Sequence, residues 1–414
     1  MNSFLYTLGI YLLGIGMKIA SFFHPKAKLW IRGRKGVFQK IEREISHNDL
    51  VIWMHVSSLG EYEQGLPLLI ALRKKFPEYK LAVSFFSPSG YEVVKNKCFA
   101  DFLFYLSLDT PSQAKKLIEL LHPSYTIFVK YDFWYNVLQA LISKNIPTIF
   151  ISSVFRPDQV YFKPRGKWFV SILKKVTHFF VQDNNSKTLL NSIDIQQVTI
   201  SGDTRFDRVK MLLKQNNYLD WLSIFKENST LIVAGSTWKE DDELLKNFIN
   251  STFFTNCKIL IAPHNMNVDY FQRLRAEFIP KTLLFSEIKD KNPADYQILI
   301  LDTVGILTKV YSYADISYVG GGFGKEGVHN VLEPAIFASP VIYGPIYDKF
   351  IEAVELLQYG GAVIIHNQNK FNEILVELLA NKEKRIIIGE KAKEYVISKP
   401  DSVQLILDYF DKIQ

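Results

Sequence analysis

Glu61 is the residue whose position suggests chemistry most directly. It follows an apolar run, residues 50–56, through the turn Ser57–Gly60. It therefore stands at the start of a predicted helix, at the edge of a sheet where the strands end. A carboxylate placed there can take a proton from a hydroxyl group that acts as a nucleophile. An acidic residue in the first turn also stabilises a helix through its dipole, so the local sequence leaves both roles open.

A second set of residues has the pattern of a nucleotide site. Three glycines, 320–322, precede the sequence HNVLEP at 329–334. A glycine-rich turn before a helix lets the backbone approach a phosphate, and the helix end favours negative charge. We therefore expect Gly321, Gly322 and Asn330 to face a phosphate. Glu333 is spaced to bind the two hydroxyls of a ribose. Glycines alone also serve tight turns, and it is the HNxxEP sequence after them that favours nucleotide binding.

Three further candidates end predicted strands in the same half of the chain. Ser236 and Thr237 lie between an apolar run and an acidic helix, where a hydroxyl group can simply cap the helix. His264 ends its own strand and can be a loop-end histidine without a ligand. The sequence contains no DxD motif and no His/Cys/Asp cluster with metal-ligand spacing. We therefore expect no metal and no cofactor.

Short apolar runs that alternate with amphipathic stretches must position these residues. Near-continuous apolar runs are typical of parallel strands that are covered on both faces. They occupy residues 50–56, 80–86, 125–130, 148–154, 178–182, 229–236, 257–263, 296–302, 316–322 and 339–344, and residues 61–76 and 112–121 are predicted helices. This alternation predicts doubly wound α/β domains. We place the domains at 25–205 and 229–398, a linker region at 206–228, and a last helix at 399–414 that can return to the first domain.

The N-terminal residues predict a hydrophobic membrane anchor, residues 1–24. Residues 3–23 are apolar apart from Lys18 and a few small polar residues, and as a helix they would span about 31 Å, one hydrocarbon core. Eight Lys and Arg oppose two Glu between residues 18 and 44, so that segment carries +6 of the net charge of +7. Basic residues after the apolar helix hold the rest of the chain in the cytoplasm and attract anionic lipid. The alternative is a buried or interfacial helix of the first domain.

Charge and cysteine content exclude other classes of protein. A protein that binds nucleic acid usually spreads basic residues over its folded surface, whereas the remainder of this chain is almost neutral. We expect no nucleic-acid partner. Cys98 and Cys257 are far apart in the sequence, which argues against a disulfide framework or a structural zinc site.

Four segments, in order along almost the whole chain, resemble the 3-deoxy-D-manno-octulosonic acid (Kdo) transferase family. They are HVSSLGEYEQGLPLLIALRKKFP at 55–77, SFFSPSGYE at 84–92, AGSTWKEDDELL at 234–245 and ADISYVGGGFGKEGVHNVLEPAIFASPVIYGP at 314–345. The first contains the SxGE turn of the family's acceptor domain, the third resembles its STHxGEEE segment, and the last contains its HNxLEP signature.

The chain departs from the family at 128–136, where Lys130 and Asp132 stand in an ETELWPN-like stretch. It also has APHN at 262–265 instead of an Arg-His pair, and Arg205 keeps a cation where GNLKFD is usual.

The resemblance implies GT-B architecture, in which two Rossmann-like α/β domains face a cleft, after an N-terminal membrane-anchor helix. It implies a glycosyltransferase that moves Kdo from CMP-Kdo to a lipid A precursor (lipid IVA) with inversion, in lipopolysaccharide biosynthesis. The enzyme would be attached to the inner membrane with its domains facing the cytoplasm.

In such an enzyme, Glu61 is the catalytic base. The donor would contact Ser236, Thr237, His264, Gly321, Gly322, Asn330 and Glu333. The acceptor and its phosphates would contact Ser58, Gly60, Ser89, Gly90, Asp132, Arg156 and Arg205. Two alternatives are another membrane-associated GT-B transferase that uses a UDP-sugar, and a membrane-tethered scaffold that binds a nucleotide without catalysis. The intact Glu61 and HNVLEP argue against a degenerate enzyme.

Overall fold

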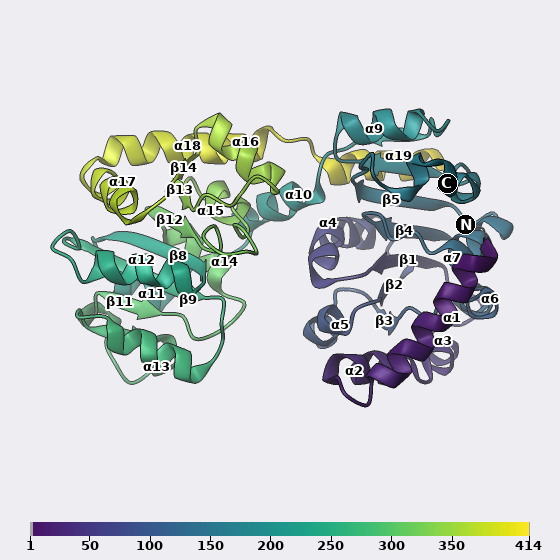
Figure 1. The fold of residues 1–414 in the computed structure, drawn as a ribbon, viewed down its shortest axis with the longest axis horizontal. Helices are drawn as coiled ribbons and strands as arrows, with labels where there is room; N and C mark the ends of the chain where they lie inside the picture. Colours follow the sequence, from purple (N-terminus) through teal and green to yellow (C-terminus); the bar gives the residue numbers. More distant parts are fainter. Residues whose placement is uncertain (1–2, 414) are drawn as a thin grey trace. The chain divides into compact units, whose positions relative to one another are not determined.

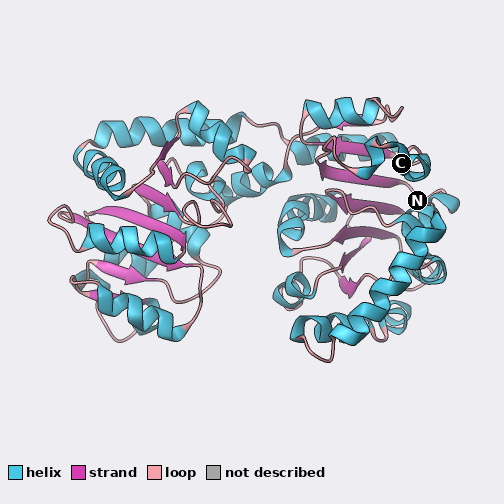
Figure 2. Ribbon diagram, in the orientation of Figure 1, coloured by secondary structure: helices cyan, strands magenta, loops and turns pink. Residues whose placement is uncertain are grey.

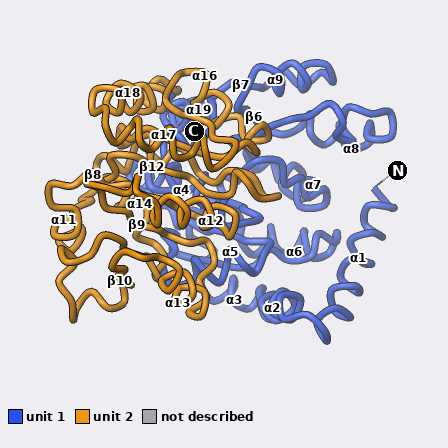
Figure 3. The backbone as a smooth tube through the Cα atoms, turned by 60° about the vertical axis from the view of Figure 1, so that its left-hand side comes forward, with its two compact units in different colours: residues 1–208, 400–414 blue, residues 209–399 orange. Residues whose placement is uncertain are grey.

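The computed structural model describes residues 3–413, which form two compact units (Figures 1 and 3). The first unit comprises Met1–Arg208 and Pro400–Gln414, and the second comprises Val209–Lys399. Each unit contains a parallel sheet with helices packed against it (Figure 2). The chain therefore leaves the first unit once and returns to it for its last helix.

The sheet of the first unit has seven strands in the order β3-β2-β1-β4-β5-β6-β7. All neighbouring strands are parallel. The strands are β1 (Val51–Val56), β2 (Lys80–Phe85), β3 (Phe102–Tyr105), β4 (Tyr125–Val129), β5 (Thr148–Ser153), β6 (His178–Val181) and β7 (Val198–Ile200). Alternate residues of β1 enter different cores, with Val51 and Trp53 on one face and Ile52 and Met54 on the other. The near-continuous apolar character of the strand follows from this double burial.

Helices cover both faces of this sheet. They are α1 (Ser3–Ala20), α2 (Pro25–Arg34), α3 (Val37–Glu44), α4 (Leu59–Lys75), α5 (Pro88–Val94), α6 (Pro111–Leu121), α7 (Tyr135–Ser143), α8 (Lys167–Leu173), α9 (Asn184–Asn191), α10 (Thr204–Lys210) and α19 (Ser402–Ile413). One core contains side chains from α3, α6, α7, α8 and α9, and the other contains side chains from α4, α5 and α19.

The second unit repeats the same plan with the strand order β10-β11-β9-β8-β12-β13-β14. Its strands are β8 (Thr230–Thr237), β9 (Cys257–Pro263), β10 (Thr282–Leu284), β11 (Ile298–Ile300), β12 (Ile316–Val319), β13 (Val341–Tyr343) and β14 (Ala362–Ile364). Its helices are α11 (Asp220–Lys226), α12 (Lys239–Ile249), α13 (Val268–Glu277), α14 (Leu307–Val310), α15 (Leu332–Ile336), α16 (Ile351–Tyr359), α17 (Gln368–Ala380) and α18 (Lys382–Ser398).

Each sheet contains a point where the direction of strand order reverses. In the first unit it lies between β1 and β4, and in the second it lies between β8 and β12. Ligands of open parallel sheets bind beyond the carboxyl ends of the strands at such switch points. Glu61 follows β1 and Asp132 follows β4, whereas Ser236 and Thr237 end β8 and the glycines 320–322 follow β12.

The segment predicted as a linker, residues 206–228, is ordered and mostly belongs to the second unit. Residues 206–208 fall in the first unit, within α10, and the second unit begins at Val209. Leu222 and Phe225 of α11 are fully buried in a core with β8 and β9. This segment therefore lacks a strand pattern because it is largely helical, and not because it is a flexible linker.

Helix α1 packs one narrow face on the first unit. The Tyr6 hydroxyl donates to Asp109 Oδ2 at 2.6 Å, and Ile10 and Gly14 are buried. A Cβ at Gly14 would lie 2.8 Å from the Leu108 side chain, so glycine allows this close approach. The opposite side of α1 exposes a row of large apolar side chains: Phe4, Leu5, Leu8, Tyr11, Leu12, Leu13, Ile15 and Ile19. Within residues 3–413, α1 is the one helix long and apolar enough to cross a membrane.

Candidate functional site

The loops that follow β1 and β2 lie together at the carboxyl edge of the first sheet. The Ser87 N–H donates to the Ser57 carbonyl at 2.9 Å. A Cβ at Gly90 would lie 2.7 Å from the Leu59 nitrogen, so the start of α5 can approach the start of α4 only with glycine there. Ser89, which precedes Gly90, exchanges a hydrogen bond of 2.8 Å with the Ser87 hydroxyl. These contacts fix the turn that presents Glu61.

The Glu61 carboxylate lies in the first turn of α4 and folds back over the turn that precedes it. Ser57 N–H donates to Glu61 Oε2 at 2.5 Å. Ser58 is the N-cap, and its hydroxyl accepts from the Glu61 N–H at 3.4 Å. Burial, with a further contribution from the charge of Asp132, raises the pKa of Glu61 to about 7. A carboxylate with a pKa near neutrality can accept a proton at physiological pH and release it again.

A buried polar network holds Asp132 beside this carboxylate. The Ser57 hydroxyl donates to Asp132 Oδ2, which lies 3.3 Å from His55 Nε2. The indole N–H of Trp134 donates to the same His55 nitrogen at 3.1 Å. The other ring nitrogen of His55, Nδ1, lies 2.8 Å from the Ser84 hydroxyl oxygen. Ser57 thus links the two carboxylates, by its N–H to Glu61 and by its hydroxyl to Asp132.

Lys130 lies at the same edge and was not among the predicted site residues. It follows β4 with a φ of 67°, in the left-handed region that non-glycine residues rarely adopt. Its N–H donates to the Ile151 carbonyl at 2.8 Å, and its carbonyl accepts from the Ser153 hydroxyl at 2.5 Å. The Lys130 charge lowers the pKa of Glu61 and so opposes part of the effect of burial. Its place at the end of the predicted strand 125–130, where it departs from the family sequence, was the available signal.

The two arginines predicted for phosphate binding have different surroundings. Arg205, in α10, donates from Nε to Asp203 Oδ2 at 2.8 Å, and Asp203 Oδ1 accepts from Gln64 of α4 at 2.9 Å. This places Arg205 next to α4, the helix whose first turn contains Glu61. Arg156 is exposed in the loop after β5, and its N–H donates to Gln159 Oε1 at 3.0 Å. Gly60, also predicted for the acceptor, has open space where a Cβ would project.

The glycines of the second unit are required by close backbone approaches. A Cβ at Gly320 would lie 2.5 Å from the Ser236 carbonyl oxygen, and one at Gly322 would lie 2.6 Å from the Gly344 nitrogen. Gly321 has a φ of 91°. Its N–H donates to Asp241 Oδ2 at 2.8 Å, so this N–H already has a partner within the protein.

Asp241 is a buried residue of this site that the sequence reasoning missed. Its carboxylate accepts from the Tyr318 hydroxyl at 2.5 Å and from the Trp238 and Gly321 N–H groups at 2.8 Å each. It therefore ties the start of α12 to the glycine segment after β12. In the sequence it stands in an acidic first turn, where a helix-stabilising residue is the ordinary interpretation.

Asn330 and Glu333 contact each other before and within α15. Asn330 Nδ2 donates to Glu333 Oε1 at 3.1 Å, and the Thr308 hydroxyl donates to Glu333 Oε2 at 2.9 Å. The helix begins at Leu332 and not at His329. Asn330, in the loop that follows the glycines, and Glu333, in the first turn of α15, thus form one polar pair.

A cavity of about 400 Å³ brings two of the predicted donor residues together. Thr237 and His264 line it with Trp238, Lys239, Asn265, Met266 and Tyr270. Ser236, which precedes Thr237 in the sequence, has a φ of 55°. This strained conformation is frequent at functional sites. The Trp238 and His264 rings stack, with centroids 4.5 Å apart and an interplanar angle of 14°.

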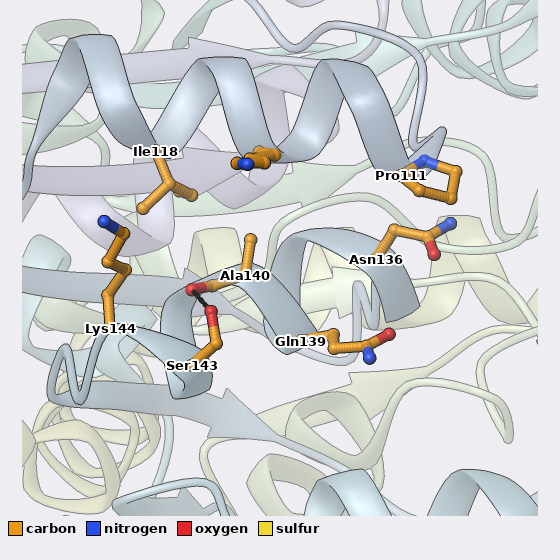
Figure 4. A pocket seen from close by; sticks show the side chains of 8 residues that line it. Pro111, Ile118, Asn136, Gln139, Ala140, Ser143 and Lys144 are labelled. Carbon is orange, nitrogen blue, oxygen red and sulfur yellow. Dashed lines mark hydrogen bonds between the residues drawn. The ribbon is translucent and has the colours of Figure 1, made fainter.

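A smaller cavity, of about 250 Å³, lies between α6 and α7 of the first unit (Figure 4). Ile118 and Ala140 face each other across it, and the Ser143 hydroxyl donates to the Ala140 carbonyl at 2.8 Å. None of the predicted site residues lines this cavity. Within residues 3–413, no group of three or more His, Cys, Asp and Glu side chains could hold a metal ion.

Sequence comparisons match one family, and comparisons with solved structures show a shared fold. Residues 31–208 match the family model described as 3-deoxy-D-manno-octulosonic-acid transferase (kdotransferase). A 3-deoxy-D-manno-octulosonic acid transferase from Aquifex aeolicus is 29% identical over 351 residues, which are 83% of this chain and 90% of the relative.

Two solved structures resemble the chain in fold. A UDP-GlcNAc 2-epimerase from Neisseria meningitidis has a TM-score of 0.62 at 14% identity and covers 88% of this chain and 100% of its own. A glycosyltransferase from Rickettsia africae has a TM-score of 0.52 at 13% identity and covers 89% of this chain and 99% of its own. Two Rossmann-like units and these likenesses confirm the predicted GT-B architecture.

Proposed function

We propose that this chain, which belongs to the 3-deoxy-D-manno-octulosonic acid (Kdo) transferase family, moves Kdo from CMP-Kdo to a lipid A precursor, lipid IVA, with inversion at the anomeric carbon. The observation that carries the proposal is Glu61, a half-buried carboxylate with its pKa raised to about 7. It lies at the switch point of the first sheet, inside the segment matched by the family model.

On the acceptor side, Glu61 acts as the general base. It takes the proton of the acceptor hydroxyl while the hydroxyl oxygen forms a bond to the anomeric carbon of Kdo. The bond from that carbon to the phosphate oxygen of CMP breaks in the same step, and CMP leaves with the electron pair. The Ser57 N–H holds Glu61 Oε2, which leaves Oε1 for the proton. A positioned base of this kind contributes about 10²- to 10⁴-fold to the rate.

On the donor side, the second unit binds CMP-Kdo. Glu333 and Asn330 contact the ribose and the phosphate, and Ser236, Thr237 and His264 contact the phosphate from the ends of β8 and β9. Gly321 and Gly322 allow the nucleotide to approach the backbone. CMP carries a single phosphate as it leaves, which oriented donors and cations can stabilise. We therefore propose that transfer needs no divalent metal and is insensitive to EDTA.

The phosphates of the lipid acceptor meet cations of the first unit. Arg205 lies beside α4 through Asp203 and Gln64, and Arg156 and Lys130 follow neighbouring strands at the same edge. The planar guanidinium group can bind a phosphate through two hydrogen bonds. Ser58, Gly60, Ser89, Gly90 and Asp132 shape the turns around Glu61.

The exposed apolar side of α1 attaches the protein to the cytoplasmic face of the inner membrane. Phe22 and Phe23, just after the helix, are 84% and 77% exposed. The basic residues from Lys26 to Lys40 follow, and they attract anionic lipid. Attachment places the active site at the surface where the lipid acceptor resides.

One assay tests the function. Purified protein is incubated with CMP-Kdo and lipid IVA in detergent, with EDTA present, and the lipid product is measured by mass spectrometry. We expect the lipid mass to increase by one or more Kdo residues. In parallel, CMP should raise the melting temperature and UDP should not. Stabilisation by UDP would favour a transferase of a UDP-sugar, and stabilisation by CMP without any transfer would favour a non-catalytic scaffold.

A further inference from the structure

Three aromatic rings of the second unit form a small assembly next to the predicted donor residues. The Trp238 and His329 rings differ by only 12° in orientation, with centroids 6.0 Å apart, and the indole Nε1 lies 2.7 Å from His329 Nε2. They are therefore nearly coplanar and joined edge to edge by a hydrogen bond. The His264 ring stacks on both, with centroids 4.5 Å from Trp238 and 4.9 Å from His329.

The hydrogen bond determines where the His329 proton is. An indole N–H donates and cannot accept, so His329 Nε2 must be the unprotonated nitrogen. The neutral ring then carries its proton on Nδ1. Protonation of Nε2 would break the bond to Trp238. Burial and the neighbouring His264 lower the pKa of His329 as well, whereas Glu326 opposes this effect.

The Nδ1–H of His329 is available for a ligand. His329 is half-buried, and among residues 3–413 no hydrogen bond involves its Nδ1. Its backbone N–H donates to the Gly320 carbonyl at 3.1 Å. A Cβ at Gly321 would lie 2.8 Å from His329 Cδ2, so that glycine makes room for the ring. The next residue in the chain is Asn330, which contacts Glu333. The ring therefore stands among the residues assigned to the nucleotide-sugar.

We propose that Trp238 is a positioning residue that holds His329 as the neutral Nδ1–H tautomer, and that this N–H donates to an anionic oxygen of the nucleotide-sugar. The ligand part of the proposal rests on the proposed function, whereas the tautomer part does not. Either the phosphate or the sugar carboxylate can supply the anionic oxygen. A neutral imidazole that donates at a fixed angle can bind such an oxygen without first gaining a proton.

Four variants separate this role from simple packing. Trp238→Phe keeps an aromatic ring for the stack but removes the N–H. Trp238→His restores a ring N–H at that position. His329→Gln removes the imidazole that Trp238 is proposed to hold. Trp221→Phe is the matched control, because Trp221 packs against Phe285 elsewhere in the second unit.

The first measurement is the tautomer of His329, by two-bond ¹⁵N–¹H correlation spectra of the full chain without ligand, with the signal assigned from His329→Gln. We expect the Nδ1–H form in the wild type and in Trp221→Phe. In Trp238→Phe we expect a mixture of tautomers and a higher His329 pKa. A wild-type His329 protonated on Nε2, or a signal unchanged by Trp238→Phe, would overturn the role given to Trp238.

The second measurement is binding of CMP, cytidine and CMP-Kdo by calorimetry. Loss of one positioned hydrogen bond should weaken binding of each ligand that carries the contacted oxygen by roughly 3- to 10-fold in Trp238→Phe, with recovery in Trp238→His. In the His329→Gln background, Trp238→Phe should have almost no further effect, because it acts through the missing ring.

Two comparisons between ligands complete the test. If cytidine binding is unchanged while CMP binding falls, the phosphate is the partner. If only CMP-Kdo binding falls, the sugar carboxylate is the partner. Additive effects of the two substitutions, or unchanged affinity for all three ligands, would contradict the contact. A wild-type protein that binds no cytidine nucleotide would refute the donor class and this ligand contact together, and the ligand-free spectra would still decide the role of Trp238.

Discussion

Glu61 and Asp132 approach each other from two strands that flank the switch point of the first sheet, and Ser57 contacts both. We expect Glu61→Gln to reduce kcat for transfer to lipid IVA by at least roughly 100-fold, because the acceptor proton then has no base. CMP binding should be unchanged. Glu63→Gln, on the same helix, is the matched control, since Glu63 pairs with Arg208 and not with the site. Wild-type turnover by Glu61→Gln would rule out the proposed base.

The stability of the same variant should depend on pH in a defined direction. The folded-state pKa of Glu61, about 7, lies above the ordinary value, so the folded protein binds this proton more tightly than the unfolded chain. The contribution of Glu61 to the free energy of unfolding is therefore fully present at acidic pH. It is lost as the pH rises from about 4.5 to about 7. Glu61→Gln, which cannot ionise, should therefore melt at a higher temperature than the wild type at pH 8, and the difference should shrink at pH 5.

Asp132 offers a test of the cause of the raised pKa. The negative charge of Asp132 raises the pKa of Glu61, and Asp132→Asn removes the charge while keeping a group that can accept from the Ser57 hydroxyl. The acidic limb of the profile of kcat/KM against pH should move to lower pH, since Glu61 then loses its proton more easily. A limb that stays in place would show that the charge of Asp132 does not contribute to the raised pKa of Glu61.

For single residues, the sequence predicted Glu61 from its place after a strand, and Asn330 and Glu333 from the HNxxEP pattern after three glycines. Their roles stay predictions. The sequence did not identify Ser57, Asp241 or Trp238 as site residues. Their roles depend on partners from other loops: Asp132 for Ser57, Gly321 for Asp241 and His329 for Trp238. No local pattern encodes such a partner, because the fold brings together residues that are 75 to 91 positions apart.

Among the elements, all ten predicted strands are present, and the four that were not predicted are the outer strands of the two sheets. They are β3, β7, β10 and β14, and each has only three or four residues. Short edge strands are a common way to limit pairing with other chains. A run of three residues such as TLL or AVI carries too little periodicity to be distinguished from a loop.

Helix α1 has two faces, and substitutions can separate them. Leu12 and Ile19 are 59% and 58% exposed. The double variant Leu12→Ser with Ile19→Ser should bind anionic vesicles much more weakly, with little change in melting temperature. These side chains are exposed in the folded protein, so the apolar surface that they bury on attachment is buried in lipid. Ile386→Ser on α18, where the side chain is 52% exposed, is the control and should leave vesicle binding unchanged. Sedimentation with vesicles measures both, and undiminished binding of the double variant would contradict the assignment of this face.

In the whole molecule, the last segment of the chain belongs to the first unit, because residues 400–414 return to it after the second unit. Val403, Ile406 and Phe410 of α19 are buried in the core formed by α4, β1 and β4. Phe410 contacts Phe76 and Tyr125, with ring centroids 6.0 and 5.2 Å away. The sequence predicted this helix and allowed its return to the first domain, but not which side chains it contacts there, because an amphipathic pattern does not specify the partners of its apolar face.

Phe410→Ala should destabilise the first unit by about 3–5 kcal/mol, the usual cost of such a cavity. Leu405→Ala on the same helix, where the side chain is partly exposed, should cost much less. Calorimetric unfolding with and without CMP distinguishes the units, because a ligand of the second unit stabilises only the state that binds it. The transition that CMP does not shift should move in Phe410→Ala, and an unchanged transition would show that α19 adds little stability.

The same connectivity imposes an order on synthesis. Domains usually complete folding from the N-terminus as they emerge from the ribosome, but here residues 209–399 are an insertion between Arg208 and Pro400 of the first unit. The inserted unit can be finished while the older part of the chain still lacks its final helix. Until α19 has been synthesised, the apolar side chains that Phe410 covers stay exposed, although α1 was synthesised long before. On the proposed attachment of α1, a nascent chain therefore reaches the bilayer before its first unit is complete.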